Sequence, residues 1–100
     1  MLFSDKIRQL REEKQLLQRQ VSAFLEMDNA LYCKIERGER RAKKEHVLIL
    51  AAFFQTDADD LLTLWLADQV YSIIKDQSQA NKALDVVQDN FAEYCIKNNK

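Results

Sequence analysis

The chain has 100 residues, of which 47% are hydrophobic and 31% are charged, and its formal net charge is −1. These values fit a single globular domain and exclude a disordered chain. With no proline and only one glycine, Gly38, the sequence disfavours hairpins and predicts an all-α protein. No apolar run approaches the ~20 residues that cross a bilayer, and charges begin too early for a signal peptide. We therefore expect a cytoplasmic protein that does not associate with a membrane.

Cysteine and histidine are too few for most site chemistries. Cys33 and Cys95 lie far apart without a CxxC motif, and His46 is the single histidine. This set disfavours a metal site, and thiols within helical patterns favour reduced cysteines. One histidine supports no catalytic constellation, and one glycine supports no phosphate-binding loop. We expect neither a cofactor nor an enzyme.

The charges are distributed unevenly along the chain. Residues 1–56 carry eleven Lys and Arg against eight Asp and Glu, whereas residues 57–100 carry four against eight. Six of the basic residues lie within residues 34–44. This asymmetry suggests a basic end that meets phosphate and an acidic end with another task, although a charge run is often only a solvated surface.

Two short helices are predicted at the start of the chain. The first covers about residues 4–14, with Ser4 as its N-cap and with Ile7 and Leu10 on one apolar face. The second covers about residues 18–25. Its inward-facing side chains are expected to be Val21, Phe24 and Leu25.

A third helix is predicted over residues 28–37 and a fourth over residues 44–54. Gly38 would end the third helix, because glycine readily takes the left-handed conformation needed at a helix C-terminus. The expected apolar side of the fourth helix consists of Val47, Leu48, Leu50, Ala51 and Phe54.

The last part of the chain predicts two longer helices. The first of these runs over about residues 57–76, capped by Asp57, and the second follows Ser78 as its cap. Apolar residues in the final helix recur at the four-three spacing of a coiled-coil seam. They are Ala80, Leu84, Val87, Phe91 and Tyr94 or Cys95.

The second and third predicted helices, with the short break between them, form a helix-turn-helix pattern. In this pattern the second helix buries one stripe, here Met27, Tyr32 and Ile35, and leaves its N-terminal turn bare for the major groove. The residues on that free side are Asp28, Asn29, Ala30, Leu31 and Lys34.

The segment "LLQRQVSAFLEMDNALYCKIERGER", together with the preceding "DKIRQLREEKQ", resembles the DNA-binding domain of the Cro/phage-repressor helix-turn-helix family. The resemblance covers about residues 3–62 and includes the closing "FFQTDADDLL". It implies a five-helix, lambda-repressor-like domain over residues 1–64, followed by a C-terminal helical extension over residues 65–100. The extension would either complete the core or form a dimer interface.

The resemblance also implies roles for particular residues. Asn29, Ala30 and Lys34 would read bases, with Asp28 and Leu31 at the edges; asparagine suits adenine, and lysine suits guanine. Arg11 and Glu36 would form an ion pair between the first and third helices. The residues expected at the phosphates are Gln18, Arg19, Arg37, Arg40, Arg41, Lys43 and Lys44.

The sequence departs from the family at two turns. Glu26 and Gln55 stand where the family usually has glycine. A non-glycine residue with positive φ costs on the order of 1 kcal/mol. Either the domain absorbs this cost or the turns take another geometry.

The resemblance implies a homodimeric transcriptional repressor that binds double-stranded DNA; a controller protein of a restriction–modification system is a variant of this hypothesis. The alternative is an antitoxin-like autoregulator whose acidic C-terminal helices hold a protein partner. The C-terminal helices could also pack on each other as part of a monomeric core. The candidate dimer residues are Trp65, Val70, Ile73, Leu84, Val87 and Phe91.

Overall fold

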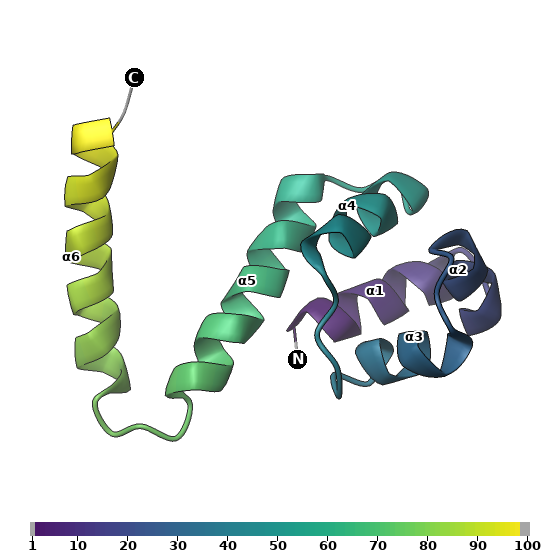
Figure 1. The fold of residues 1–100 in the computed structure, drawn as a ribbon, viewed down its shortest axis with the longest axis horizontal. Coiled ribbons are helices and arrows are strands. Elements are labelled where there is room, and N and C mark those ends of the chain that lie inside the picture. The colour runs from purple at the N-terminus through teal and green to yellow at the C-terminus, as the bar shows by residue number, and fades with distance from the viewer. Residues whose placement is uncertain (1, 99–100) are drawn as a thin grey trace. The chain divides into compact units, whose positions relative to one another are not determined.

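A computed structural model describes residues 2–98 and contains six α-helices and no strand in that range (Figure 1). The helices are α1 (Leu2–Glu13), α2 (Gln18–Phe24), α3 (Asn29–Glu36), α4 (Lys44–Phe53), α5 (Ala58–Ile74) and α6 (Ala80–Asn98). The all-α prediction and the order of the helices are thus confirmed. None of the described helices is both long enough and apolar enough to span a membrane.

The start of α1 differs from the prediction. The helix begins at Leu2, and Ser4 is buried inside its first turn and does not cap it. The cap comes instead from Asp68, whose carboxylate accepts hydrogen bonds from the backbone N–H groups of Leu2 (2.9 Å) and Phe3 (2.8 Å). A carboxylate at this end of a helix both satisfies free donors and interacts favourably with the helix dipole.

The starts and ends of the last two helices are close to those predicted. The Asp57 side chain accepts a hydrogen bond from the backbone N–H of Asp59 (2.9 Å), as expected of a cap, and α5 ends at Ile74. Helix α6 begins at Ala80, and its first turn is closed by the N–H of Ala83 on the carbonyl of Gln79. The cap position therefore falls on Gln79 and not on Ser78.

Four helices end in the same way, with one residue in the left-handed region. These residues are Gln15 (φ 56°), Glu26 (φ 55°), Gly38 (φ 79°) and Gln55 (φ 56°). In each case the following N–H bonds to a carbonyl five residues back, the pattern of a Schellman motif. The turns at Glu26 and Gln55 therefore keep the geometry for which glycine is usual.

The residue that follows the turn differs between the stops at Gln15 and Glu26 and the stop at Gly38. Leu16 and Met27, which follow Gln15 and Glu26, are partly buried against the core. Glu39, which follows Gly38, is exposed. Burial of the side chain after the turn can offset the cost of positive φ at the first two stops, whereas the stop before an exposed residue uses glycine.

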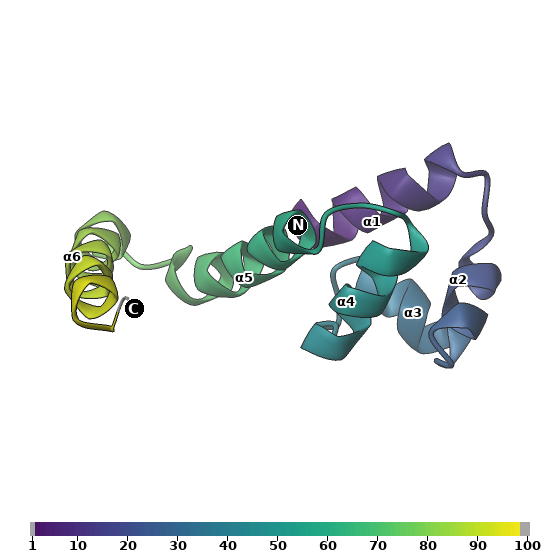
Figure 2. The same ribbon diagram turned by 90° about the horizontal axis from the view of Figure 1, so that it is seen from above.

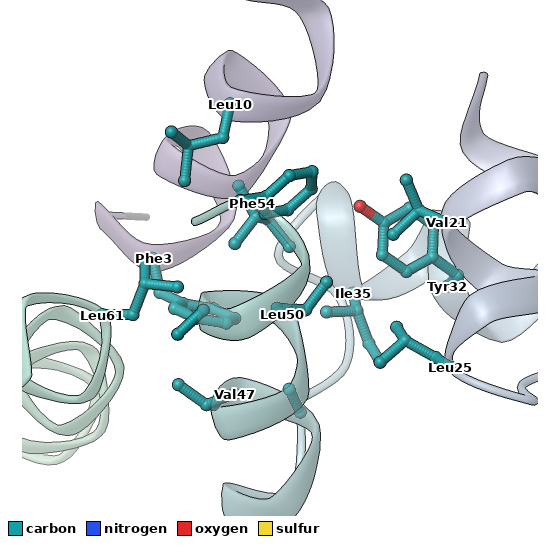
Figure 3. Packing of buried hydrophobic residues seen from close by; sticks show 13 residues of the cluster. Phe3, Leu10, Val21, Leu25, Tyr32, Ile35, Val47, Leu50, Phe54 and Leu61 are labelled. Atoms are coloured by element: carbon teal, nitrogen blue, oxygen red, sulfur yellow. The ribbon is translucent and has the colours of Figure 1, made fainter. Parts of the chain in front are cut away.

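The hydrophobic core is built from α1 to α4, from the start of α5, and from Ala42 in the loop before α4. Helix α3 packs against α2 (Figure 2) and against α1 (Figure 1). Figure 3 shows Ile35 between Leu25 and Leu50, while the ring of Tyr32 lies beside Val21. The core residues are Phe3, Ile7, Leu10, Val21, Leu25, Tyr32, Ile35, Ala42, Val47, Leu50, Ala51, Phe54 and Leu61.

Two residues expected to face inward are exposed instead. Phe24 is 53% exposed and Leu48 is 44% exposed. Helix α2 has only seven residues, and its core-facing side is occupied by Val21 and Ser22. The Phe24 ring therefore lies at the edge of the core, where its centroid is 4.2 Å from that of Phe53.

The chain divides into two compact units, the first ending at Gln69 and the second beginning at Val70. Every buried side chain in the described residues belongs to the first unit. The second unit contains the end of α5 and all of α6, and its described side chains are exposed or, at Ile74 and Ala80, intermediate.

Candidate nucleic-acid interface

Helices α2 and α3 and their connecting turn form a helix-turn-helix. The turn is short: α2 ends at Phe24, Glu26 takes positive φ, and the N–H of Met27 bonds to the carbonyl of Ser22 (2.9 Å). Asp28 has an extended backbone immediately before α3 and makes no side-chain cap there. The first turn of α3 is therefore not covered by its own capping side chain.

The two sides of α3 differ sharply in burial. Tyr32, Ile35 and Glu36 are buried, which is the three-to-four-residue spacing of one helical face. Ala30 and Lys34 lie on the opposite side of the helix and are exposed. Asp28 and Asn29 lie in line with the buried face by helical spacing, but at the start of the helix they too are exposed. Leu31 and Met27 are intermediate and pack against the core. Of the five residues predicted to read bases, four are exposed, and Leu31 is shared with the domain interior.

Asn29 contacts α2 through one atom of its side chain. Its Oδ1 lies 3.2 Å from Oγ of Ser22, which also lies 3.1 Å from the carbonyl of Arg19. The hydroxyl has one hydrogen and can donate to only one of these acceptors at a time. The interaction restrains the Asn29 amide near the start of α3, and its NH₂ group remains directed away from this contact.

A buried ionic cluster joins α1, α2 and α3. Nε and Nη2 of Arg11 each donate to the carboxylate of Glu36 at 2.9 Å, and Nη1 donates to the carbonyl of Leu16 (2.8 Å). Glu36 is only 2% exposed. Its Oε1 also accepts a hydrogen bond from Nε2 of Gln18 (3.1 Å). The Arg11–Glu36 pair that the family resemblance implies is present in this bidentate form.

The surroundings of Glu36 keep its side chain ionised. Burial by itself raises the pKa of the carboxyl, but its interactions with Arg11, Tyr32 and Gln18 outweigh burial and hold the pKa below its usual value. Burial and the neighbouring carboxylate together raise the pKa of the Tyr32 phenol. The cluster therefore holds α3 against α1 with one positive and one negative charge at neutral pH.

Gln18 is directed largely toward the protein. Its Nε2 donates to Glu36, and its Oε1 accepts from Sγ of Cys33 (3.2 Å). An amide NH₂ has two hydrogens, so one donor is left for a phosphate. The cluster fixes this side chain at the first residue of α2, where a phosphate contact is predicted.

The loop from α3 to α4 carries most of the predicted phosphate-binding residues. Arg40, Arg41, Lys43 and Lys44 are exposed, whereas Ala42 between them is 3% exposed. The Ala42 carbonyl accepts a hydrogen bond from Nε1 of Trp65 (2.8 Å). The remaining phosphate candidates are on helices or at their ends: Arg19 is exposed, and so is Arg37.

Arg37 is already paired within the protein. Its Nε lies 2.8 Å from Oε2 of Glu39, and both side chains are more than half exposed. Exposed pairs of this kind contribute little to stability. A phosphate could therefore replace Glu39 as the partner of Arg37.

The predicted dimer residues fall into two groups. Val70, Ile73, Leu84, Val87 and Phe91 are exposed, with Phe91 at 62% and Ile73 at 74%. Trp65, by contrast, packs against the core of the first unit and donates to Ala42. Its side chain is thus engaged within its own protomer.

Sequence comparison identifies the family of this domain. Residues 2–64 match the family described as a helix-turn-helix domain, which is of the Cro and phage-repressor type. The chain belongs to this family, whose members bind DNA and are typically not enzymes. No curated protein and no solved structure matches the chain.

Several positioning residues have no signal in the sequence. The side chains of Ser22 and Cys33 contact the candidate DNA-binding residues Asn29 and Gln18. Those of Trp65 and Asp68 contact the loop before α4 and the start of α1. The contacts of Trp65 and Asp68 span 23 and 66 residues, and no local spacing rule reports such pairs. Within residues 2–98, no group of three or more His, Cys, Asp or Glu could hold a metal ion.

Proposed function

We propose that this protein is a sequence-specific transcriptional regulator, most simply a repressor, that binds operator DNA as a homodimer. The observation that carries this proposal is the exposed start of α3: Asn29 is exposed in its first turn, and Lys34 is exposed on the side opposite the buried Tyr32. A helix presented in this way can enter the major groove, where asparagine and lysine can each pair with a purine.

The basic residues on either side of α3 would supply affinity for any sequence. Arg40, Arg41, Lys43 and Lys44 follow α3, and Arg19 lies in the first turn of α2. Each phosphate contact releases counterions, so binding should weaken as salt increases. Base contacts from Asn29 and Lys34 would then select among sites that the basic residues hold equally well.

Helix α6 supports the homodimer. Its apolar side chains recur at the spacing of a coiled-coil seam, yet the described residues from Asn81 to Lys97 are all exposed. At 100° per residue, Asp85, Asp89 and Glu93 lie on the opposite side of the helix from Leu84, Val87 and Phe91. The apolar stripe is therefore free of charged residues, which suits pairing with a second copy.

In vitro selection of duplex sites by the purified chain tests this function. We expect a two-fold symmetric site with half-sites about one helical turn apart. Asn29→Ala combined with Lys34→Ala should reduce the preference for that site at least ~tenfold, because each base contact contributes about 1–3 kcal/mol of discrimination. Binding to unrelated duplexes should persist.

The matched control is Asn81→Ala combined with Lys82→Ala, which removes the same two residue types from exposed positions of α6. This variant should select the same site as the wild type. Equal sequence preference in the α3 variant and the control would contradict base reading by α3.

The second candidate function is an autoregulator whose C-terminal helices hold a protein partner. The same exposed stripe on α6 favours it, since the stripe requires some apolar surface to cover it. Light scattering distinguishes the two. A dimer at micromolar concentration supports the first proposal, whereas a monomer that becomes a stable heterocomplex with a co-expressed partner supports the second.

A further inference from the structure

The loop between α3 and α4 joins two pairs of basic residues and has little regular structure to hold it. Arg40 and Arg41 precede Ala42, and Lys43 and Lys44 follow it. At the turn around Gly38, the N–H of Glu39 donates a hydrogen bond to the carbonyl of Lys34. At the start of α4, the N–H groups of His46 and Val47 donate to the carbonyl of Lys43. Residues 40–42 lie between these two sets of backbone bonds.

A hydrogen bond from Trp65 holds the segment between these two sets of backbone bonds. In the part of the chain that the structure describes, the only hydrogen bond to residues 40–42 is the one from the indole Nε1 of Trp65 to the carbonyl of Ala42, at 2.8 Å. Ala42 is 3% exposed, so both its methyl group and its carbonyl are held by the domain. The anchor thus lies at the centre of the loop.

The backbone conformation explains how one anchor can orient several side chains. Lys43 is extended (φ −78°, ψ 156°), and successive side chains of an extended segment point to opposite sides. With Ala42 directed into the domain, its neighbours Arg41 and Lys43 are directed outward, and both are exposed. Fixing Ala42 therefore fixes the direction of the cations on either side.

We propose that Trp65 is a positioning residue for DNA binding: its indole N–H holds the loop so that Arg41 and Lys43, the neighbours of Ala42, face the phosphates together. The inference rests on the proposed function, in which these two residues contact the DNA backbone. A loop that is already ordered loses less conformational entropy on binding and so binds more tightly. Trp65 lies on α5 and acts through the loop without touching DNA.

A proteolysis experiment tests the positioning step without DNA. Trypsin cleaves after arginine and lysine, so its cutting rate after Arg40 and Arg41 measures how freely the loop opens. In Trp65→Phe, which keeps an aromatic ring but loses the donor, we expect loop cleavage to accelerate about three- to tenfold, the factor for losing one hydrogen bond. Cleavage after Lys82, in α6, should not change and serves as the internal reference.

Leu64→Ala is the matched control. Leu64 is a partly buried neighbour on α5 that packs against the same core and makes no contact with the loop through a hydrogen bond. Its loss should lower the melting temperature without raising loop cleavage relative to Lys82. Equal loop cleavage in Trp65→Phe and the wild type, or an equal increase in Leu64→Ala, would overturn the proposal.

An isosteric replacement covers the case in which phenylalanine disturbs the fold. The chain has a single tryptophan, so biosynthetic incorporation of benzothienylalanine changes Trp65 alone, replacing the indole N–H with sulfur. The same increase in loop cleavage is expected. An unchanged rate with this residue would count against the hydrogen bond even if Trp65→Phe misfolded.

A binding cycle then connects the loop to DNA. Trp65→Phe should weaken binding to the selected site and to an unrelated duplex by the same factor, about three- to tenfold. In a background with Arg41→Ala and Lys43→Ala, the same change should cost less than about twofold, because the side chains through which Trp65 acts are gone. Equal losses of affinity in both backgrounds would overturn the positioning role while leaving DNA binding intact.

A wild-type protein that binds no duplex would instead refute the proposed function. The proteolysis result would still show whether Trp65 holds the loop.

Discussion

The two units of this chain use apolar residues in different ways. In the first unit, which ends at Gln69, apolar side chains from α1 to α5 are buried against one another, and Ile7, Val21 and Tyr32 are completely inaccessible. In the second unit, the apolar side chains of α6 are exposed, with Val87 at 60% and Phe91 at 62%. The first unit contains its own stabilising contacts, whereas the described apolar side chains on the α6 stripe are left exposed, as is typical of an interaction surface.

The difference in burial between the two units parallels the extent of the family match. The family match ends at residue 64, inside the first unit, where the fold also explains the site. In the proposed function, the second unit associates through the exposed stripe of α6. Experiments that measure the stability of the first unit separately from association through α6 therefore test this difference between the units.

The largest expected effect comes from placing a charge on the stripe of α6. Val87→Asp should convert the proposed dimer to a monomer and weaken binding to a two-fold site by about 10²–10⁴, the range of avidity lost when two linked binding events become one. The melting temperature of the first unit should hardly change. Gel-shift titration and light scattering measure the two consequences.

Val86→Asp provides the control for this prediction. Val86 is exposed to nearly the same extent as Val87, at 58% against 60%, but lies off the stripe by helical spacing. It should leave both the dimer and the affinity intact. Equal effects of the two substitutions would mean that α6 does not associate through the stripe.

A second large effect is expected inside the first unit, at the Arg11–Glu36 pair. Arg11→Ala leaves a carboxylate that is 2% exposed without its charged partner, so we expect a loss of about 3 kcal/mol in the free energy of unfolding. Urea denaturation at neutral pH measures this loss. Arg37→Ala, which removes an exposed ion pair with Glu39, is the control and should leave stability unchanged.

The same pair predicts the response to acid. The folded-state pKa of Glu36 lies below its unfolded value of about 4.5, so the stabilisation is complete above that unfolded value and is lost as pH falls through the folded pKa. Glu36→Gln should remove this part of the acid sensitivity. An acid-unfolding profile identical to that of the wild type would show that another carboxylate dominates.

A smaller effect is expected at the junction between α5 and the start of α1. Asp68→Ala removes the carboxylate that caps Leu2 and Phe3 and should destabilise the first unit by about 1–2 kcal/mol. Asp68→Asn keeps one side-chain oxygen as an acceptor and should cost less. If both variants had the same melting temperature as the wild type, the part of α5 beyond the family match would not contribute to the stability of the first unit.

Local patterns in the sequence predict much of this fold. Apolar periodicity gives the order of the helices, and Gly38 marks the end of α3. The family resemblance, and not local spacing, implies the Arg11–Glu36 pair. The exposure of Asn29 and Lys34 follows from the helix-turn-helix register. These features depend on residues close in sequence or on a motif with a fixed geometry.

Long-range contacts account for what the sequence did not predict. Asp68 replaces Ser4 as the cap of α1 because the packing of α5 brings it there, and only the fold determines that contact. Phe24 was expected inside because phenylalanine is usually buried, but a seven-residue helix presents too narrow a face to bury every apolar residue. The role of Trp65 likewise depends on a tertiary hydrogen bond and not on helical spacing.

The smallest expected effect concerns the helix stops that lack glycine. Gln55 has φ 56° at the end of α4, where the N–H of Thr56 bonds to the carbonyl of Ala51 at 2.9 Å. Left-handed geometry costs an ordinary residue about 1–2 kcal/mol, and glycine removes this cost but adds about 0.5–1 kcal/mol of backbone entropy. Gln55→Gly should therefore stabilise the first unit by about 0.5–1 kcal/mol in urea denaturation.

The opposite substitution at the one native glycine sharpens this test. Gly38→Ala keeps the same Schellman geometry at the end of α3 but introduces a Cβ at φ 79°, so it should destabilise by about 1 kcal/mol. Neither change should alter association, because neither residue lies in the second unit. If Gln55→Gly failed to stabilise while Gly38→Ala destabilised, the side chain of Gln55 would itself support the turn, and packing around the stop would outweigh backbone strain.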